Sequence, residues 1–168
     1  MVIKKAVPVL GILLALQVSA QEFTPASPRG PLMKYQVLRD TDPALNTEFR
    51  ERGLKEWMSK RDTTLEKAKK LLEEKNYVLV NQLLFPYDYL EPEDAVFYDY
   101  LGKSYFYSGL FQPALDCFTI SNEEKKQAEL YFFIGQCQEN LGNEKEAQRA
   151  YKKGAKEGNE ACKAKLSE

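Results

Sequence analysis

The sequence predicts an all-α protein: a short α-solenoid of three helix-turn-helix repeats, with an N-terminal flanking helix and a C-terminal capping helix. Apolar and small residues recur at a fixed step between Asp62 and Ala161, the step that leads from Leu65 to Tyr98 and from Tyr98 to Tyr131. A fixed period of this length is typical of stacked repeats. Hydrophobic residues make up 43% of the 168-residue chain and aromatic residues 12%, which favours a folded core over disorder.

The period is visible at six places in each unit. They are held by Leu65, Ala68, Leu72, Asn76, Asn81 and Phe85, then by Tyr98, Leu101, Tyr105, Gly109, Ala114 and Phe118, and then by Tyr131, Ile134, Gln138, Gly142, Ala147 and Tyr151. The fourth place, held by Asn76, Gly109 and Gly142, falls where a helix C-terminus needs positive φ. The sequence therefore predicts a turn there in each unit, between two helices.

The predicted organisation places short segments before and after the three repeats. The boundaries are 1–20 for a signal peptide, 21–33 for a Pro-rich linker, 34–61 for the flanking segment, 62–94, 95–127 and 128–160 for the repeats, and 161–168 for the end of the capping helix.

Residues 1–20 have the pattern of a secretory signal peptide. Lys4 and Lys5 precede an apolar stretch, Ala6–Leu16, and Val18–Ala20 offers small residues for cleavage. The apolar stretch is shorter than a membrane-spanning helix needs, and an uncleaved anchor is the alternative. The segment resembles the export signals of Gram-negative bacteria, which implies a periplasmic or secreted protein with no transmembrane segment in the mature chain.

The flanking helix is predicted to begin at Asp42-Pro43, a cap followed by proline in the first turn. Phe49, Leu54 and Trp57 then follow at helical spacing, and we expect their face to cover the open end of the array, where Trp57 acts as a packing residue. A short helix over 158–166 is expected to close the other end.

Residues that start or stop helices mark the repeat units. Three pairs have the spacing of capping boxes: Thr63 with Glu66, Ser121 with Glu124, and Asn143 with Glu146. Pro113 is predicted in the first turn of a helix, where its missing N–H costs little. Pro86 is predicted to end the second helix of the first unit early, because it disfavours a helical conformation at Phe85.

The repeated residues resemble the tetratricopeptide repeat (TPR). The second unit matches its pattern best, with Tyr98, Leu101, Gly102, Tyr105, Gly109, Ala114 and Phe118. The third unit keeps Gly135 but has Gln138 at an aromatic place, and the first has Lys69 at the glycine place. The resemblance implies that the first helix of each pair lines a concave groove that receives a peptide or a partner helix.

The groove places implied by this resemblance are rich in aromatic residues. They are Asp99, Tyr100, Lys103, Phe106 and Tyr107 in the second unit, and Phe132, Phe133, Gln136, Glu139 and Asn140 in the third. Aromatic side chains are frequent anchors of protein interfaces, so we expect a partner-binding groove. In the alternative interpretation, the N-terminal helix fills the groove or the rings pack between units.

The composition argues against catalysis, cofactors and nucleic acid. The chain has no histidine, which removes the commonest general base and metal ligand. Its 24 basic and 25 acidic residues form no basic stripe. The cysteines have no metal-site spacing, and no phosphate loop or nucleophile motif is present. The sequence predicts a protein that is not an enzyme and has no cofactor or metal.

Cys117 and Cys137 fall on helices that are expected to be neighbours. A disulfide between them is one interpretation in an oxidising compartment. The favoured interpretation is that all three cysteines, Cys162 included, are small buried hydrophobic residues.

Two functional hypotheses follow. The first is a non-enzymatic adaptor or scaffold of the bacterial envelope, which binds a peptide segment or partner protein in the aromatic groove. The second is a structural component that self-associates into a homo-oligomer.

Overall fold

The computed structural model describes residues 43–167, with side chains from residue 47 onward. The predicted signal peptide, the linker and residues 34–42 lie outside these residues. The described part is all-helical and contains no strand, so the predicted all-α, solenoid-like fold is confirmed. Its seven helices are α2 (Pro43–Glu73), α3 (Tyr77–Asp88), α4 (Ala95–Tyr107), α5 (Phe111–Glu124), α6 (Ala128–Asn140), α7 (Glu144–Lys156) and α8 (Glu160–Lys165).

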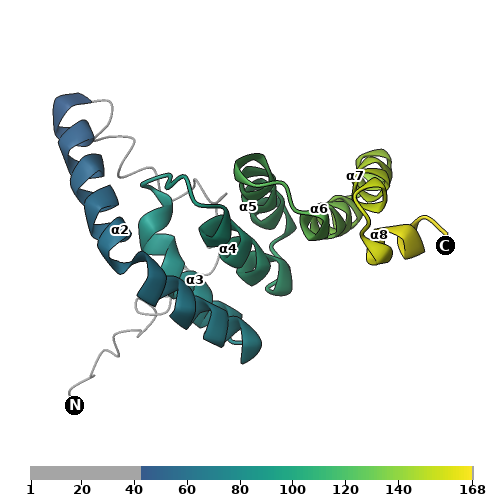
Figure 1. The fold of residues 1–168 in the computed structure, drawn as a ribbon, viewed down its shortest axis with the longest axis horizontal. Helices are drawn as coiled ribbons and strands as arrows, with labels where there is room; N and C mark the ends of the chain where they lie inside the picture. The colour runs from purple at the N-terminus through teal and green to yellow at the C-terminus, as the bar shows by residue number, and fades with distance from the viewer. Residues whose placement is uncertain (1–42, 168) are drawn as a thin grey trace, which may run out of the picture.

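The helices follow one another along an extended molecule, from α2 at one end to α8 at the other (Figure 1). Each helix packs against its neighbours in sequence, and contacts between α2 and α4 and between α6 and α8 join successive pairs. One large core runs through α2 to α6, and a smaller one joins α6, α7 and α8. Within residues 43–167, no helix has the length and apolar character needed to cross a membrane.

Glycines close the turns of the second and third helix pairs as predicted. Gly109 and Gly142 have φ of 77° and 78°, a conformation that side chains with a Cβ seldom adopt. The backbone N–H of the residue after each glycine donates to a carbonyl of the preceding helix. In the second pair, the Leu110 N–H donates to the Tyr105 carbonyl at 2.9 Å. This is the hydrogen bond of a Schellman-type helix end.

The first pair departs from the predicted register by one residue. Lys75 has the positive φ, 58°, whereas Asn76 begins the next element as the N-cap of α3. The step from Lys75 to Gly109 is therefore longer by one residue than the step from Gly109 to Gly142, so the gapless alignment is wrong here. Val80 and Leu84, both fully buried, take the core places of α3 that the sequence assigned to Asn81 and Phe85.

The flanking helix and the first repeat helix are one continuous helix, α2. The prediction of a new helix start at Thr63 is wrong, because no proline or helix-ending turn separates the two segments. Gly53 does not interrupt α2 either. Its missing side chain lets the Leu90 side chain approach the helix, and a Cβ on Gly53 would lie 2.5 Å from Leu90 Cδ2.

Trp57 fixes the N-terminal half of α2 to the loop and helices that follow. Its exposed fraction is 1%, and its ring centroid lies 5.0 Å from that of Tyr87 and 5.1 Å from that of Phe97. The prediction that Trp57 is a packing residue is confirmed. The contacts are made at the α3–α4 connection, so α2 covers this connection instead of folding back over the open end of the array.

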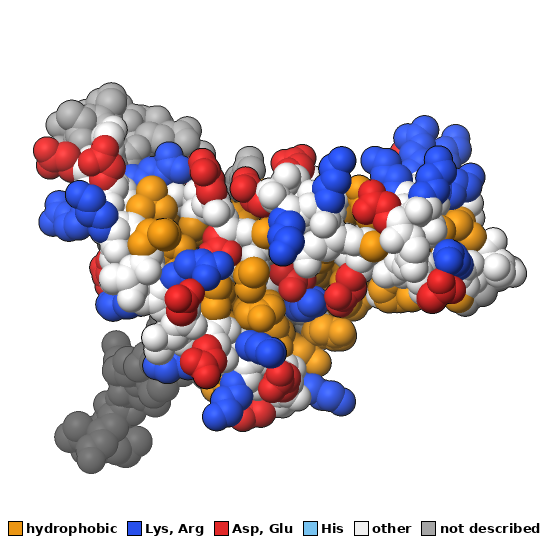
Figure 2. Space-filling model, in the orientation of Figure 1, with side chains coloured by type: hydrophobic (Ala, Val, Ile, Leu, Met, Phe, Trp, Pro, Cys, Tyr) orange, Lys and Arg blue, Asp and Glu red, His pale blue; other side chains and the backbone are white. Residues whose placement is uncertain are grey.

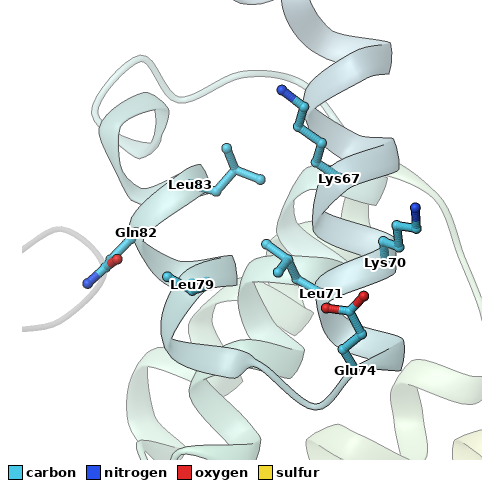
Figure 3. A pocket seen from close by; sticks show the side chains of 7 residues that line it. All are labelled: Lys67, Lys70, Leu71, Glu74, Leu79, Gln82 and Leu83. Carbon is cyan, nitrogen blue, oxygen red and sulfur yellow. The ribbon is translucent and has the colours of Figure 1, made fainter.

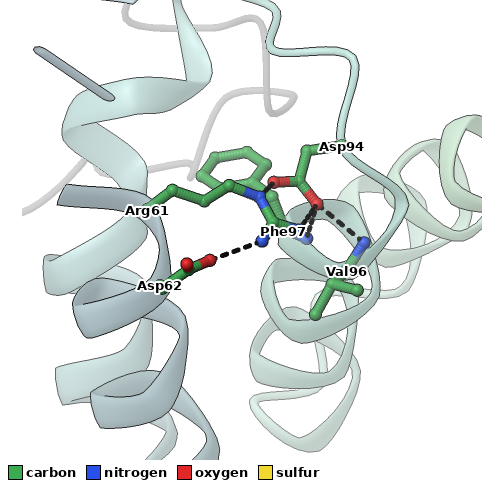
Figure 4. Close-up of polar contacts among 5 residues, drawn as sticks. All are labelled: Arg61, Asp62, Asp94, Val96 and Phe97. Atoms are coloured by element: carbon green, nitrogen blue, oxygen red, sulfur yellow. Dashed lines mark hydrogen bonds and ion pairs between the residues drawn. The ribbon is translucent and has the colours of Figure 1, made fainter. Parts of the chain in front are cut away.

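An ion pair joins α2 to the start of α4 (Figure 4). Asp94, the N-cap of α4, accepts hydrogen bonds from the backbone N–H groups of Val96 and Phe97 at 3.1 and 3.2 Å. Arg61 donates to the same carboxylate, Nε to Oδ2 at 2.5 Å and Nη2 to Oδ1 at 3.1 Å. One carboxylate therefore both caps α4 and holds α2 against it.

Some of the other predicted helix boundaries are wrong. Ser121 lies inside α5, and its hydroxyl donates to the Ala95 carbonyl at 2.7 Å instead of capping a helix. Pro86 lies inside α3, which continues to Asp88, because a proline near the end removes only one intrahelical hydrogen bond. Pro113 does lie in the first turn of α5, as predicted.

The asparagines that precede the last two helices behave differently. Asn143 is the N-cap of α7, but its amide donates to Gln138 Oε1 at 2.9 Å and makes no capping hydrogen bond. Asn159 caps α8 by accepting from the backbone N–H of Cys162 at 2.8 Å. The closing helix is thus shorter than predicted and begins only after Gly158, whose φ is 90°.

Candidate functional site

The candidate site lies where α4 faces α6, on the first helices of the second and third pairs. Hydrophobic surface gathers near the centre of the molecule, over α4, with charged side chains of both signs around it (Figure 2). The ten residues predicted to bind a partner belong to these two helices. The structure brings five of them into one cluster: Asp99, Lys103, Phe106, Tyr107 and Phe133.

Lys103 is the centre of the polar half of this cluster. Its Nζ lies 3.0 Å from Asp99 Oδ2, one turn earlier on α4, and 3.6 Å from Glu129 Oε1 on α6. The same nitrogen lies 5.6 Å from the centroid of the Phe133 ring, within the range of a cation–π interaction. Lys103 therefore links α4 to α6 through the Glu129 carboxylate and the Phe133 ring, and Asp99 holds its ammonium group from the same helix.

Asp99 is a buried carboxylate that is only partly compensated. Its exposed fraction is 9%, and its Oδ1 has no hydrogen-bond partner among the described residues. Burial raises the pKa of Asp99 although Lys103 favours the ionised form. For Lys103, burial opposes the charge, but Asp99 and Glu129 outweigh it and raise its pKa. The ammonium group is therefore held in its charged form between two carboxylates.

The aromatic half of the cluster packs between helix pairs. The Phe133 ring lies 5.3 Å from Phe106 and 5.1 Å from Phe118 of α5, measured between centroids. Its exposed fraction is only 8%. The expectation that these aromatic side chains line an open groove is therefore wrong for Phe133, because Phe106 and Phe118 cover its ring. For this residue the alternative interpretation, a ring packed between units, is the correct one.

Tyr107 is the aromatic residue of the cluster that faces solvent. Its exposed fraction is 50%, and its ring stacks on that of Tyr77, the first residue of α3, at 4.7 Å and 19°. The centroid of the Phe133 ring lies 6.4 Å away. Stacking on Tyr77 holds the Tyr107 ring in a fixed orientation at the surface, which reduces the entropy that an incoming group would have to overcome.

The other five predicted residues are placed differently. Phe132 is half-buried and contacts Phe133 and Tyr151. Tyr100 is half-buried against the main core. Further along α6, the Asn140 amide donates to the Gln136 carbonyl at 2.8 Å.

Glu139 forms an ion pair with Lys165 of α8, at 3.7 Å. Glu139 therefore contacts the C-terminal helix and does not belong to the cluster around Lys103.

Two members of the site were not predicted from the sequence. Glu129 holds the same place at the start of α6 that Val96 holds at the start of α4, and Tyr77 begins α3 as Phe111 begins α5. Both could have been found by extending the repeat alignment to the first residues of each helix. Tyr77 also needed the longer step of the first pair, which only the structure reveals.

The three cysteines are free and buried in the structure, as the favoured interpretation holds. Cys117, Cys137 and Cys162 each have an exposed fraction of 0%. Burial raises the pKa of Cys117 well above its usual value and that of Cys137 to about 12. The thiols therefore stay protonated at neutral pH and make poor nucleophiles.

Comparison with known proteins adds no family to this geometry. A scan against protein-family models finds no match, and a search of curated proteins finds no similar sequence. Among residues 43–167, no three His, Cys, Asp or Glu side chains lie close enough together to hold a metal ion. The arrangement on α4 and α6 offers fixed charges and an ordered aromatic ring, which suit it to binding.

Proposed function

We propose that this chain is a non-enzymatic, TPR-like adaptor, exported to the bacterial envelope, which binds a peptide segment or partner protein at the α4–α6 surface. The observation that carries this proposal is Tyr107. A half-exposed ring, stacked on Tyr77 and placed beside the Asp99–Lys103–Glu129 cluster, has the combination of aromatic anchor and polar surroundings found at protein interfaces.

The charges of Asp99, Lys103 and Glu129 give the proposal a second support. Asp99 and Glu129 share one ammonium group, so hydrogen-bond capacity remains on the carboxylates. A partner that brings a donor near Glu129, whose side chain is 65% exposed, gains a charge-assisted hydrogen bond. We expect such a partner to bind more weakly at high salt, because exposed charges are screened.

The test is capture of partners from envelope fractions, with Tyr107→Ala as the main variant. Tyr107 suits this test better than the buried Phe133 or the half-buried Phe106, because truncating a ring that packs on the core also disturbs the core. We expect Tyr107→Ala to weaken capture by about 10-fold or more, as for an interface anchor that contributes about 1.4 kcal/mol or more.

A matched control is Leu166→Ala at the far end of the molecule, where the exposed fraction is 37%. This variant should capture the same partners as the unchanged chain. Circular dichroism should show full helicity for both variants. Equal capture by Tyr107→Ala and the unchanged chain would refute the α4–α6 surface as the binding site.

A further inference from the structure

A second feature of the molecule is a hollow of about 520 Å³ between α2 and α3. Figure 3 shows Leu71 and Leu83 directed into the space between the two helices, with Leu79 at its edge and Lys67, Lys70 and Glu74 along α2. Leu79 is 43% exposed, and the neighbouring Val78 is 63% exposed. The hollow thus combines an apolar floor with a charged rim.

The hollow borders the core that the first pair shares with the rest of the array, because Leu71 and Leu83 also pack against that core. Ala68, Val80 and Leu84 are fully buried in that core, whereas Leu79, which also lines the hollow, is 43% exposed. In a stacked array each pair covers the flank of the next, so the end pair keeps one flank in contact with solvent. Because α2 continues as one helix and does not turn back, no described segment covers this flank.

The charges along α2 are arranged so that the hollow can pair with a copy of itself. Lys67, Leu71 and Glu74 lie at spacings of four and three residues, which places them on one face of a helix. Lys67 and Lys70 precede Leu71, and Glu74 follows it. None of these three charged residues forms an ion pair within residues 43–167. When two such faces meet antiparallel with the two-fold axis between Lys70 and Leu71, the Lys67 of each copy faces the Glu74 of the other.

We infer that two copies of this chain associate through the α2–α3 hollow, with a two-fold axis near Leu71. The two helix pairs pack face to face as four helices, and Leu71, Leu79 and Leu83 of both copies fill the shared core. A two-fold contact uses the same patch on both copies and therefore closes at two. The patch is small, so the dimer is weak, with a dissociation constant in the micromolar range, about 1–100 µM.

Sedimentation equilibrium tests this association, with protein that has been purified in the form the cell produces. The unchanged chain should pass from monomer to dimer across roughly 1 to 300 µM. Leu79→Asp places a charge in the shared core, and we expect it to raise the dissociation constant by more than about 10-fold. Leu166→Asp, an apolar position at the opposite end, is the matched control and should leave the dissociation constant unchanged.

Charge reversal tests the pairing itself. Lys67→Glu should weaken the dimer by roughly 3- to 10-fold, because it places like charges opposite each other. Adding Glu74→Lys to the same chain should restore most of the affinity. All these positions are exposed, so circular dichroism should show the folded state throughout.

Three outcomes would overturn the inference. One is a monomer at every concentration, and another is a dimer that Leu79→Asp does not weaken. The third is a dimer that forms only after residues 1–42 are removed, which would show that this segment fills the hollow. None of these results bears on Tyr107, so the proposed partner-binding surface is tested separately.

Discussion

The first helix pair and the two later pairs differ in how closely their helices approach. In the later pairs a ring lies directly on a glycine: a Cβ on Gly102 would lie 2.8 Å from the Phe118 ring, and a Cβ on Gly135 would overlap the Tyr151 ring. The longer step that leads from Lys75 to Gly109 also leads from Ala68 to Gly102. Ala68 therefore holds the place of this glycine on α2. Ala68 is fully buried but carries a Cβ where the later pairs have none, and a hollow lies between α2 and α3.

The first pair is instead held at its connection to α4. Trp57 packs on Tyr87 and Phe97, Arg61 pairs with Asp94, and Arg50 Nε donates to the Leu90 carbonyl at 3.0 Å. The comparison shows that one helix-turn-helix plan can be stabilised in two ways. Close approach at a glycine joins the helices of each later pair, whereas the first pair combines its share of the main core with side-chain contacts at the connection to α4.

The largest effect is expected from Trp57→Ala. Truncation of a fully buried Trp costs about 3–5 kcal/mol through lost burial and the cavity left behind. Because Trp57 holds the first pair to the array, hydrogen exchange should become faster in α2 and α3 while α4 to α7 stay protected. Met58→Ala, at a neighbouring position that is 69% exposed, is the control and should change the free energy of unfolding by less than about 0.5 kcal/mol. Uniform loss of protection would mean that the two regions unfold as one.

Gly135→Ala tests whether the close approach of α6 and α7 stabilises a later pair. A methyl group would overlap the Tyr151 ring, and overpacking of this kind costs about 1–3 kcal/mol, measured by urea unfolding. Gly142→Ala is the control, since a Cβ there meets no atom within 4 Å and only the positive φ is unfavourable. We expect the control to lose about 1 kcal/mol. If Gly135→Ala proved as stable as the unchanged chain, close approach would not be what stabilises this pair.

Asp94→Ala should cost about 2 kcal/mol, because it removes both the cap of α4 and the charged partner of Arg61. Asp94→Asn can still cap the helix and should lose about half as much. Thermal unfolding measures both. Asp62, whose side chain is 93% exposed, also contacts Arg61, and Asp62→Ala should be nearly neutral. A loss in Asp62→Ala that equals the loss in Asp94→Ala would contradict the assignment.

The effect that is smallest at neutral pH concerns the buried cysteines, of which Cys117 and Cys137 lie in the later pairs and Cys162 lies in α8. The pKa of Cys137 is raised to about 12 in the folded protein, above the usual value of about 8.5. Unfolded thiols therefore release protons first, so stability should be unaffected at neutral pH and should fall as the pH rises above about 9. For one thiol the loss approaches about 1.4 kcal/mol per pH unit.

Urea unfolding between pH 7 and 10 measures this decline, and Cys137→Ala should make it shallower. A decline of the same slope in Cys137→Ala would show that other groups cause it. The three thiols of the native protein should also resist alkylation at pH 8, and all three should react once the chain is denatured.

Several features of this protein were determined by the sequence alone. The periodic apolar residues predicted paired helices, and Gly109 and Gly142 predicted their turns, because helix periodicity and positive φ are local properties. The resemblance to the TPR also put Asp99, Lys103 and Tyr107 at groove positions, and all three lie on one face of α4, but their part in binding stays a prediction. The export signal, the TPR-like identity and the partner remain predictions.

Only the tertiary structure decided which local signals were used. Thr63 has the pattern of a helix start, yet α2 passes through it, because Trp57 before it and Leu65 and Ala68 after it are buried in the same core. Phe133 has the position of a groove residue, yet Phe106 and Phe118 bury it. A helix cap contributes about 1 kcal/mol to stability. Contacts between residues distant in sequence can contribute more, and they then decide where a helix begins and which side chains are buried.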